Sequence, residues 1–123
     1  MTFEDSPFEF TKAWFALGVV TPARLAALRA EWDRGEDNNP EHYRWRAFRE
    51  FLIERRPLPP ELVTALYQLG AEDRDQGMGG SMMDTLVRLP ECPERVLVAA
   101  AGSGRRHLVR LVERRRAEPT TNE

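Results

Sequence analysis

The sequence is poor in several features, and each shortage limits what the protein can be. Its 123 residues include one cysteine, Cys92, so no disulfide can form within the chain. No apolar run approaches the ~20 residues that a membrane-spanning helix needs. The first ten residues are acidic and lack the basic start of a secretory signal peptide. A cytoplasmic location is therefore expected.

Residues that carry catalysis or hold metals are equally scarce. The two histidines, His42 and His107, do not stand at metal-ligand spacing with each other or with Cys92. The glycine-rich run at 77–81 lacks the Lys-Ser/Thr ending of a phosphate-binding P-loop, and an EF-hand loop starting at Asp73 would need glycine where Met78 stands. We therefore expect no cofactor, no metal and no catalytic site, in a protein that is not an enzyme.

The charges give no overall attraction to nucleic acid, because 18 basic residues face 20 acidic ones and the formal net charge is −2. All the basic residues except Lys12 are arginines. That bias is typical of a GC-rich coding sequence and points to a bacterial source.

The chain has instead a series of apolar stripes at helical spacing, separated by proline and glycine. Thr21-Pro22 and Asn39-Pro40 each place a capping residue before a proline that suits the first turn of a helix. No alternating run rich in Val, Ile or Thr indicates a strand. We expect about seven helices, near residues 8–17, 22–34, 40–55, 62–69, 82–89, 94–101 and 105–116.

The stretch 71–92 contains an acidic, glycine-rich segment that the sequence predicts to be a loop. Gly70 suits the C-terminal cap of the helix before it. Ser81, with Asp84 three residues later, resembles a capping box that would start the next helix. Pro90 should end that helix near Leu89.

A shift of 34 residues aligns part of the chain with itself, so that Pro59 falls on Pro93 and Gly70 on Gly104. A fixed period of this size is typical of helical-repeat arrays, although a single helical bundle with two similar hairpins remains the alternative. We expect an all-α fold of antiparallel helical hairpins, forming a single domain over residues 1–117 with a disordered tail at 118–123.

The segment 89–115 carries a proline-marked start at Cys92-Pro93, an apolar helix and a small polar turn at 102–104 before an arginine-rich helix. It resembles one unit of the bacterial HEAT-like and leucine-rich-variant helical repeats. The usual Asp-Pro-Asp turn of those units is absent here. The resemblance implies a short HEAT-like α-solenoid that binds another protein.

Two sets of charged residues are candidate binding sites. If successive hairpins alternate their loops between two edges, the loops near 33–38 and 72–75 share one edge, which would suit a basic protein partner. Its carboxylates are those of Asp33, Glu36, Asp37, Glu72, Asp73 and Asp75. An immunity protein that covers the basic active site of a toxin would look like this, as would an adaptor; a solvated loop edge is the simpler interpretation.

The last helix offers the alternative of nucleic-acid binding, because its arginines recur at helical spacing. The candidate residues are Arg105, Arg106, Arg110 and Arg114. Glu113 interrupts this basic series, so a solvated last helix is again the simpler interpretation. The sequence leaves open whether Trp45 and Cys92 lie in the core or at the surface.

Overall fold

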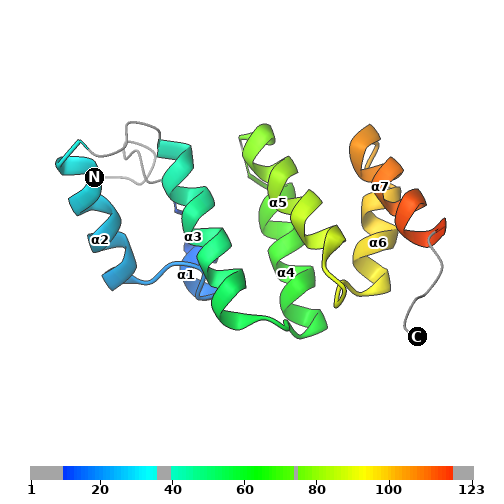
Figure 1. Ribbon diagram of the computed structural model, residues 1–123, viewed down its shortest axis with the longest axis horizontal. Coiled ribbons are helices and arrows are strands. Elements are labelled where there is room, and N and C mark those ends of the chain that lie inside the picture. Colours follow the sequence, from blue (N-terminus) through cyan, green and yellow to red (C-terminus); the bar gives the residue numbers. More distant parts are fainter. Residues whose placement is uncertain (1–9, 36–39, 74, 118–123) are drawn as a thin grey trace. The chain divides into compact units, whose positions relative to one another are not determined.

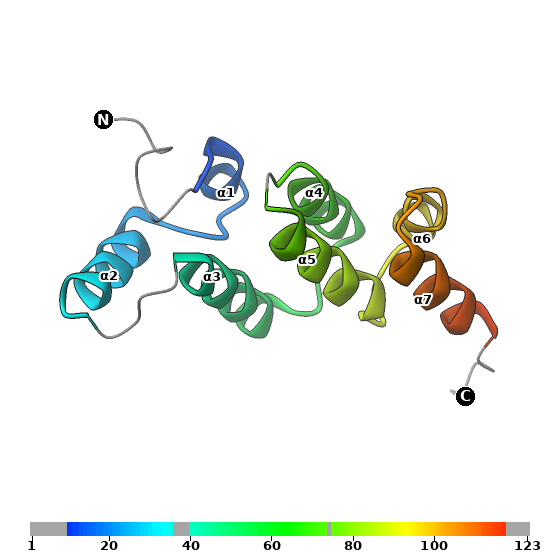
Figure 2. The same ribbon diagram turned by 90° about the horizontal axis from the view of Figure 1, so that it is seen from above.

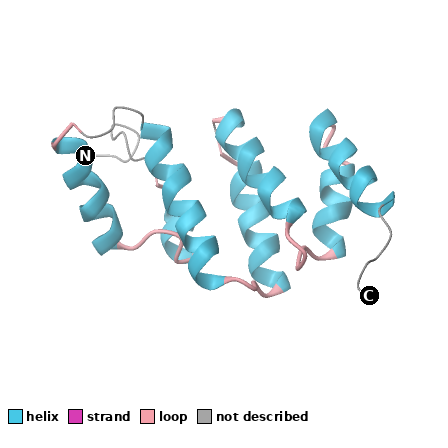
Figure 3. Cartoon of the chain, viewed as in Figure 1, coloured by secondary structure: helices cyan, strands magenta, loops and turns pink. Residues whose placement is uncertain are grey.

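The structure is a computed structural model that describes residues 10–35, 40–73 and 75–117. Over these residues the chain is all-helical, with seven helices and no strand (Figures 1 and 3). The helices are α1 (Lys12–Ala16), α2 (Pro22–Asp33), α3 (Pro40–Arg55), α4 (Pro60–Ala71), α5 (Gln76–Arg88), α6 (Glu94–Ala101) and α7 (Arg106–Ala117). Within the described ranges, none of these helices has the length and apolar character needed to cross a membrane. The tail at 118–123 lies outside the described residues.

Contacts within the chain group it into two compact units, Met1–Arg56 and Pro57–Glu123. The first unit contains α1 to α3 and the second contains α4 to α7. The expectation of one domain over residues 1–117 stays a prediction.

The first unit is held together by large side chains. Trp14, Leu28 and Tyr43 are almost completely buried, one from each helix. Trp32 of α2 meets the Tyr43 ring edge-on, with centroids 6.1 Å apart. Arg46 of α3 donates to Glu31 of α2 at 2.6 Å. This contact lowers the pKa of Glu31, chiefly through the hydrogen bond from Arg46.

The first helix is shorter than the sequence predicted. It starts at Lys12, because Phe10 and Thr11 are not helical, and the expected start at Phe8 lies outside the described residues. Phe10 is nevertheless buried and packs edge-on against Trp14, with centroids 5.2 Å apart. Its apolar character therefore reflects burial of the segment before the helix rather than a further helical turn.

In the second unit α4 packs most extensively against α5, α6 packs against α7, and α5 also contacts α7 (Figure 2). The core between these helices contains the methionines Met78, Met82 and Met83 of α5 together with leucines and valines from the other helices. α6 has the bounds that the sequence predicted, and α7 begins one residue later than expected. Gly104 has a φ of 77°, which suits the turn before α7.

The prediction for the glycine-rich segment was wrong. Residues 76–80 form the first turns of α5, and the cap is Asp75, whose Oδ1 accepts from the Met78 N–H at 3.0 Å. Ser81, the expected cap, is an exposed residue inside the helix. Gly70 does not end α4 either, since it is buried in the last turns of that helix.

The glycines have a packing role instead of a turn role. A Cβ on Gly79 would lie 2.2 Å from the carbonyl oxygen of Gly70. In the same way, a Cβ on Gly70 would lie 3.1 Å from the carbonyl oxygen of Gly79. The two helices therefore approach each other at a point where neither has a side chain. Glycine is tolerated inside both helices because their close contact offsets its poor helix propensity.

Candidate binding groove on α5 and α7

A groove of about 300 Å³ lies on the surface of the second unit, between α5 and α7. Its lining residues are mostly basic. They are Asp84 and Arg88 of α5 and Arg106, His107, Arg110, Leu111 and Arg114 of α7. Four arginines and one aspartate give this lining a formal charge of +3 with His107 neutral.

The periodicity of α7 places three of these arginines along one stripe. Leu108, Leu111 and Val112 are buried against the other helices, whereas Arg106, Arg110 and Arg114 are exposed. Residues four apart lie on neighbouring turns of the same helix face. The three residues therefore follow one another beside the groove at intervals of about 6 Å along the helix axis.

The three stripe arginines differ from Arg88 in their partners. Arg88 Nε donates to Asp84 Oδ1 at 2.6 Å, and this hydrogen bond raises the pKa of Arg88. Arg106, Arg110 and Arg114 form no ion pair with any residue in the described ranges. Their positive charge is thus available to a ligand.

The remaining arginines at this end of the chain lie outside the groove lining. Arg105 lies outside the groove lining, with its Nη1 3.8 Å from where a Gly80 Cβ would be. Arg115 donates to the carbonyl oxygens of Val87 and Leu89, both at 2.8 Å, and to that of Pro90 at 3.2 Å. Arg116 forms an ion pair with Glu94. The groove lining therefore includes Arg106, Arg110 and Arg114 of the predicted basic set but not Arg105.

Arg88 and Asp84 were missed as groove residues by sequence reasoning. They are four apart near the end of α5, which alone indicates a surface ion pair. Their place in the groove follows from the packing of α5 against α7, and no local sequence pattern reports that packing.

The acidic candidates have a different setting. Asp75 caps α5, and its own N–H donates to Asp73 Oδ1 at 2.8 Å, so both carboxylates take part in a half-buried turn. Glu72 is exposed and accepts from Gln68 Nε2 at 2.7 Å. Asp33 is exposed and belongs to the other unit, while Glu36 and Asp37 lie outside the described residues. The shared acidic edge stays a prediction.

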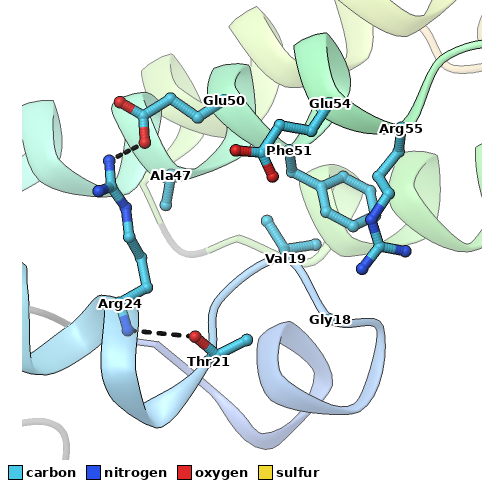
Figure 4. Close-up of a pocket in the computed structure, with 9 residues that line it drawn as sticks. All are labelled: Gly18, Val19, Thr21, Arg24, Ala47, Glu50, Phe51, Glu54 and Arg55. Atoms are coloured by element: carbon cyan, nitrogen blue, oxygen red, sulfur yellow. Dashed lines mark hydrogen bonds and ion pairs between the residues drawn. The ribbon is translucent and has the colours of Figure 1, made fainter.

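A second depression, of about 220 Å³, lies in the first unit (Figure 4). Val19, Ala47 and Phe51 supply its apolar lining. An ion pair between Arg24 and Glu50 spans one side. The Arg55 guanidinium carbon lies 5.2 Å from the Phe51 ring centroid. The charges of both signs around this depression give it no net preference for a charged ligand.

The structure places the two residues whose position was left open. Cys92 is buried, and desolvation raises the pKa of its thiol to about 11. A thiol with this pKa stays protonated at neutral pH, so Cys92 acts as a small core residue rather than a nucleophile. Trp45 is half-buried, with its ring centroid 5.6 Å from that of Phe48.

No group of three or more His, Cys, Asp or Glu side chains in the described ranges is placed to hold a metal ion. Comparisons with family models, with curated proteins and with solved structures gave no match. The HEAT-like resemblance therefore stays a prediction, and the assignment of a site rests on the geometry of this chain.

Proposed function

We propose that this chain is a non-catalytic helical binding module whose groove between α5 and α7 holds an anionic partner. The observation that carries the proposal is the stripe of Arg106, Arg110 and Arg114, which is exposed and without ion pairs among the described residues. Like charges held close together on one helix cost stability. A partner with negative charges would offset that cost.

The HEAT-like architecture is part of the same proposal. α4 begins at Pro60 and α6 at Glu94, so the two helices start 34 residues apart, at the shift that aligns Pro59 with Pro93. The pairs α4–α5 and α6–α7 are each in contact, as stacked hairpins require. Arrays of this kind commonly present their surfaces to partners.

We expect neutralisation of the arginine stripe to weaken binding to polyanions. Wild-type protein should be retained on immobilised heparin, and Arg106→Gln/Arg110→Gln/Arg114→Gln should elute at clearly lower salt, because fewer counterions are released on binding. The measurement is the eluting salt concentration together with the circular dichroism spectrum, which should stay that of the wild type.

Arg95→Gln is the matched control for the single substitution Arg110→Gln, because Arg95 is an exposed arginine of α6 outside the groove and 4.0 Å from Glu61. It should elute close to the wild type. Equal shifts for Arg95→Gln and Arg110→Gln would show that net charge alone governs retention, and the groove would lose its assignment.

A second proposal keeps the acidic loops as a site for a basic protein, as an immunity or adaptor protein would need. The supporting observation is the hydrogen-bonded turn that holds Asp73 and Asp75 next to the exposed Glu72. A turn fixed in this way presents its charges with little loss of conformational freedom on binding.

Asparagine substitution separates the charge of this turn from its capping role. Asp73→Asn/Asp75→Asn keeps both side-chain oxygens that accept hydrogen bonds, and asparagine is a good N-cap, so the fold should be retained. The variant should bind poly-lysine several-fold more weakly at low salt, as measured by anisotropy. Glu61→Gln/Glu113→Gln removes the same charge elsewhere in the second unit. Equal weakening by this control would refute the site.

A further inference from the structure

We infer that the anionic partner of the groove is the phosphate backbone of a nucleic-acid duplex, bound without recognition of base sequence. The inference rests on the proposed function of the groove and names its partner. Three features support it: the spacing of the arginines, the polar character of the lining and the local segregation of charge.

The spacing of the arginine stripe fits a polymer with regularly repeated charges. Arg106, Arg110 and Arg114 are separated by four residues each, or about 6 Å along α7. This interval is close to that between neighbouring phosphates of one nucleic-acid strand. The planar guanidinium group also binds phosphate through two parallel hydrogen bonds, which a lysine cannot do.

The lining favours nucleic acid over an acidic protein. Protein interfaces are anchored by aromatic and apolar side chains that become buried on binding. Leu111 is the one apolar residue that lines the groove. It is already buried in the core of the unit, with only 8% of its surface exposed, so a partner could bury little more of it. Nucleic-acid interfaces are in contrast polar and strongly basic.

The lining also favours a duplex over a single strand. Proteins that bind single strands stack the bases on aromatic side chains. The seven lining residues include no Phe, Tyr or Trp, and the one ring among them is that of His107. Contacts to phosphates alone carry no sequence information, so sequence-independent binding of duplex backbone is the expected mode.

Charge within the second unit is segregated although the chain as a whole is slightly acidic. α7 contains five arginines and one glutamate, Glu113. The acidic residues of the unit lie mainly on other elements, such as Glu72 and Asp73 at the end of α4. A local basic face can bind phosphates when the net charge is negative, because charges beyond a Debye length of about 8 Å are largely screened.

Asp84 provides a test in which binding to the groove should become stronger rather than weaker. Its carboxylate holds Arg88 in an exposed ion pair at the groove. Removal of this pair should cost little stability, because exposed ion pairs contribute only ~0–1 kcal/mol. Asp84→Asn would both release Arg88 and remove a negative charge that repels phosphate, so it should strengthen binding.

The experiment is fluorescence anisotropy of the full chain with a labelled DNA duplex, its single strand and poly-glutamate. With three phosphate contacts the slope of log K against log salt should be about −2.7 for the duplex, which weakens binding about 40-fold between roughly 50 and 200 mM salt. Arg110→Gln should weaken duplex binding roughly five- to tenfold and reduce the slope by about one, whereas Asp84→Asn should strengthen binding several-fold. Arg95→Gln should change affinity less than about twofold.

The outcomes distinguish an error in the partner from an error in the binding site. Duplexes of unrelated sequence should bind equally, and tighter binding of the single strand or of one particular sequence would overturn the inference. Binding of heparin or poly-glutamate, but not of the duplex, would also overturn it and leave the proposed groove intact. If Arg110→Gln leaves every polyanion bound as before, the groove itself is refuted.

Discussion

Gly79→Ala should destabilise the second unit more than any other glycine-to-alanine substitution in α5. The added Cβ would lie 2.2 Å from the Gly70 carbonyl oxygen, which belongs to the backbone of α4 and cannot rotate away. The helices must separate, and overpacking of this kind costs about 1–3 kcal/mol or more even after the gain in helix propensity. Thermal unfolding followed by circular dichroism should show a midpoint lower by on the order of 10 °C.

The neighbouring glycines provide graded controls. A Cβ on Gly80 would have its nearest neighbours outside the helix, the Arg105 and His107 side chains, at 3.8 Å, so Gly80→Ala should be neutral or stabilising by about 0.5–1 kcal/mol. A Cβ on Gly70 would lie 3.1 Å from Gly79 O and from Met82 Cβ. The loss of stability for Gly70→Ala should therefore fall between the effects of Gly79→Ala and Gly80→Ala. If Gly79→Ala unfolded at the same temperature as Gly80→Ala, this result would contradict the close contact of α4 and α5 at Gly79.

The same glycines show why part of the fold could not be predicted from the sequence. The helix starts at Pro22 and Pro40 follow from local chemistry, because proline fixes the backbone angle that the first turn needs. The start of α5 does not. Glycines usually indicate a turn. Their role here is to let two helices approach each other, and that contact exists only after α4 and α5 have packed together.

The candidate groove, like the fold, could be predicted only in part from the sequence. The spacing of Arg106, Arg110 and Arg114 in the sequence suffices to place them on one face of a helix. Whether an arginine is available to a ligand depends on its partners, and these differ along the same helix. Arg115 donates hydrogen bonds to backbone carbonyls, and Arg116 forms an ion pair with Glu94. Neither partner could be predicted from the neighbouring sequence.

The occupied arginine leads to the second large expected effect. Arg115→Met should destabilise the second unit, because it removes the donors to Val87 and Leu89 carbonyl oxygens while keeping much of the apolar stem of the side chain. These carbonyls lie at the C-terminal end of α5, where the helix itself supplies no donors, and the Leu89 oxygen also accepts from the Cys92 N–H at 3.0 Å. Hydrogen bonds that involve a charged group contribute about 1.5–3 kcal/mol each, and part of this would be recovered by water. We expect a loss of about 2 kcal/mol.

Urea unfolding of Arg115→Met beside Arg116→Met gives a matched comparison on adjacent residues. Arg116 pairs with Glu94 at an exposed site, so its removal should cost at most about 1 kcal/mol. The midpoint should fall clearly for Arg115→Met with an unchanged denaturant slope, which would locate the effect in the native contacts. Arg115→Lys restores the charge but not the two-pronged geometry and should recover stability only in part. Equal midpoints for the two methionine variants would mean that Arg115 does not fasten α7 to the end of α5.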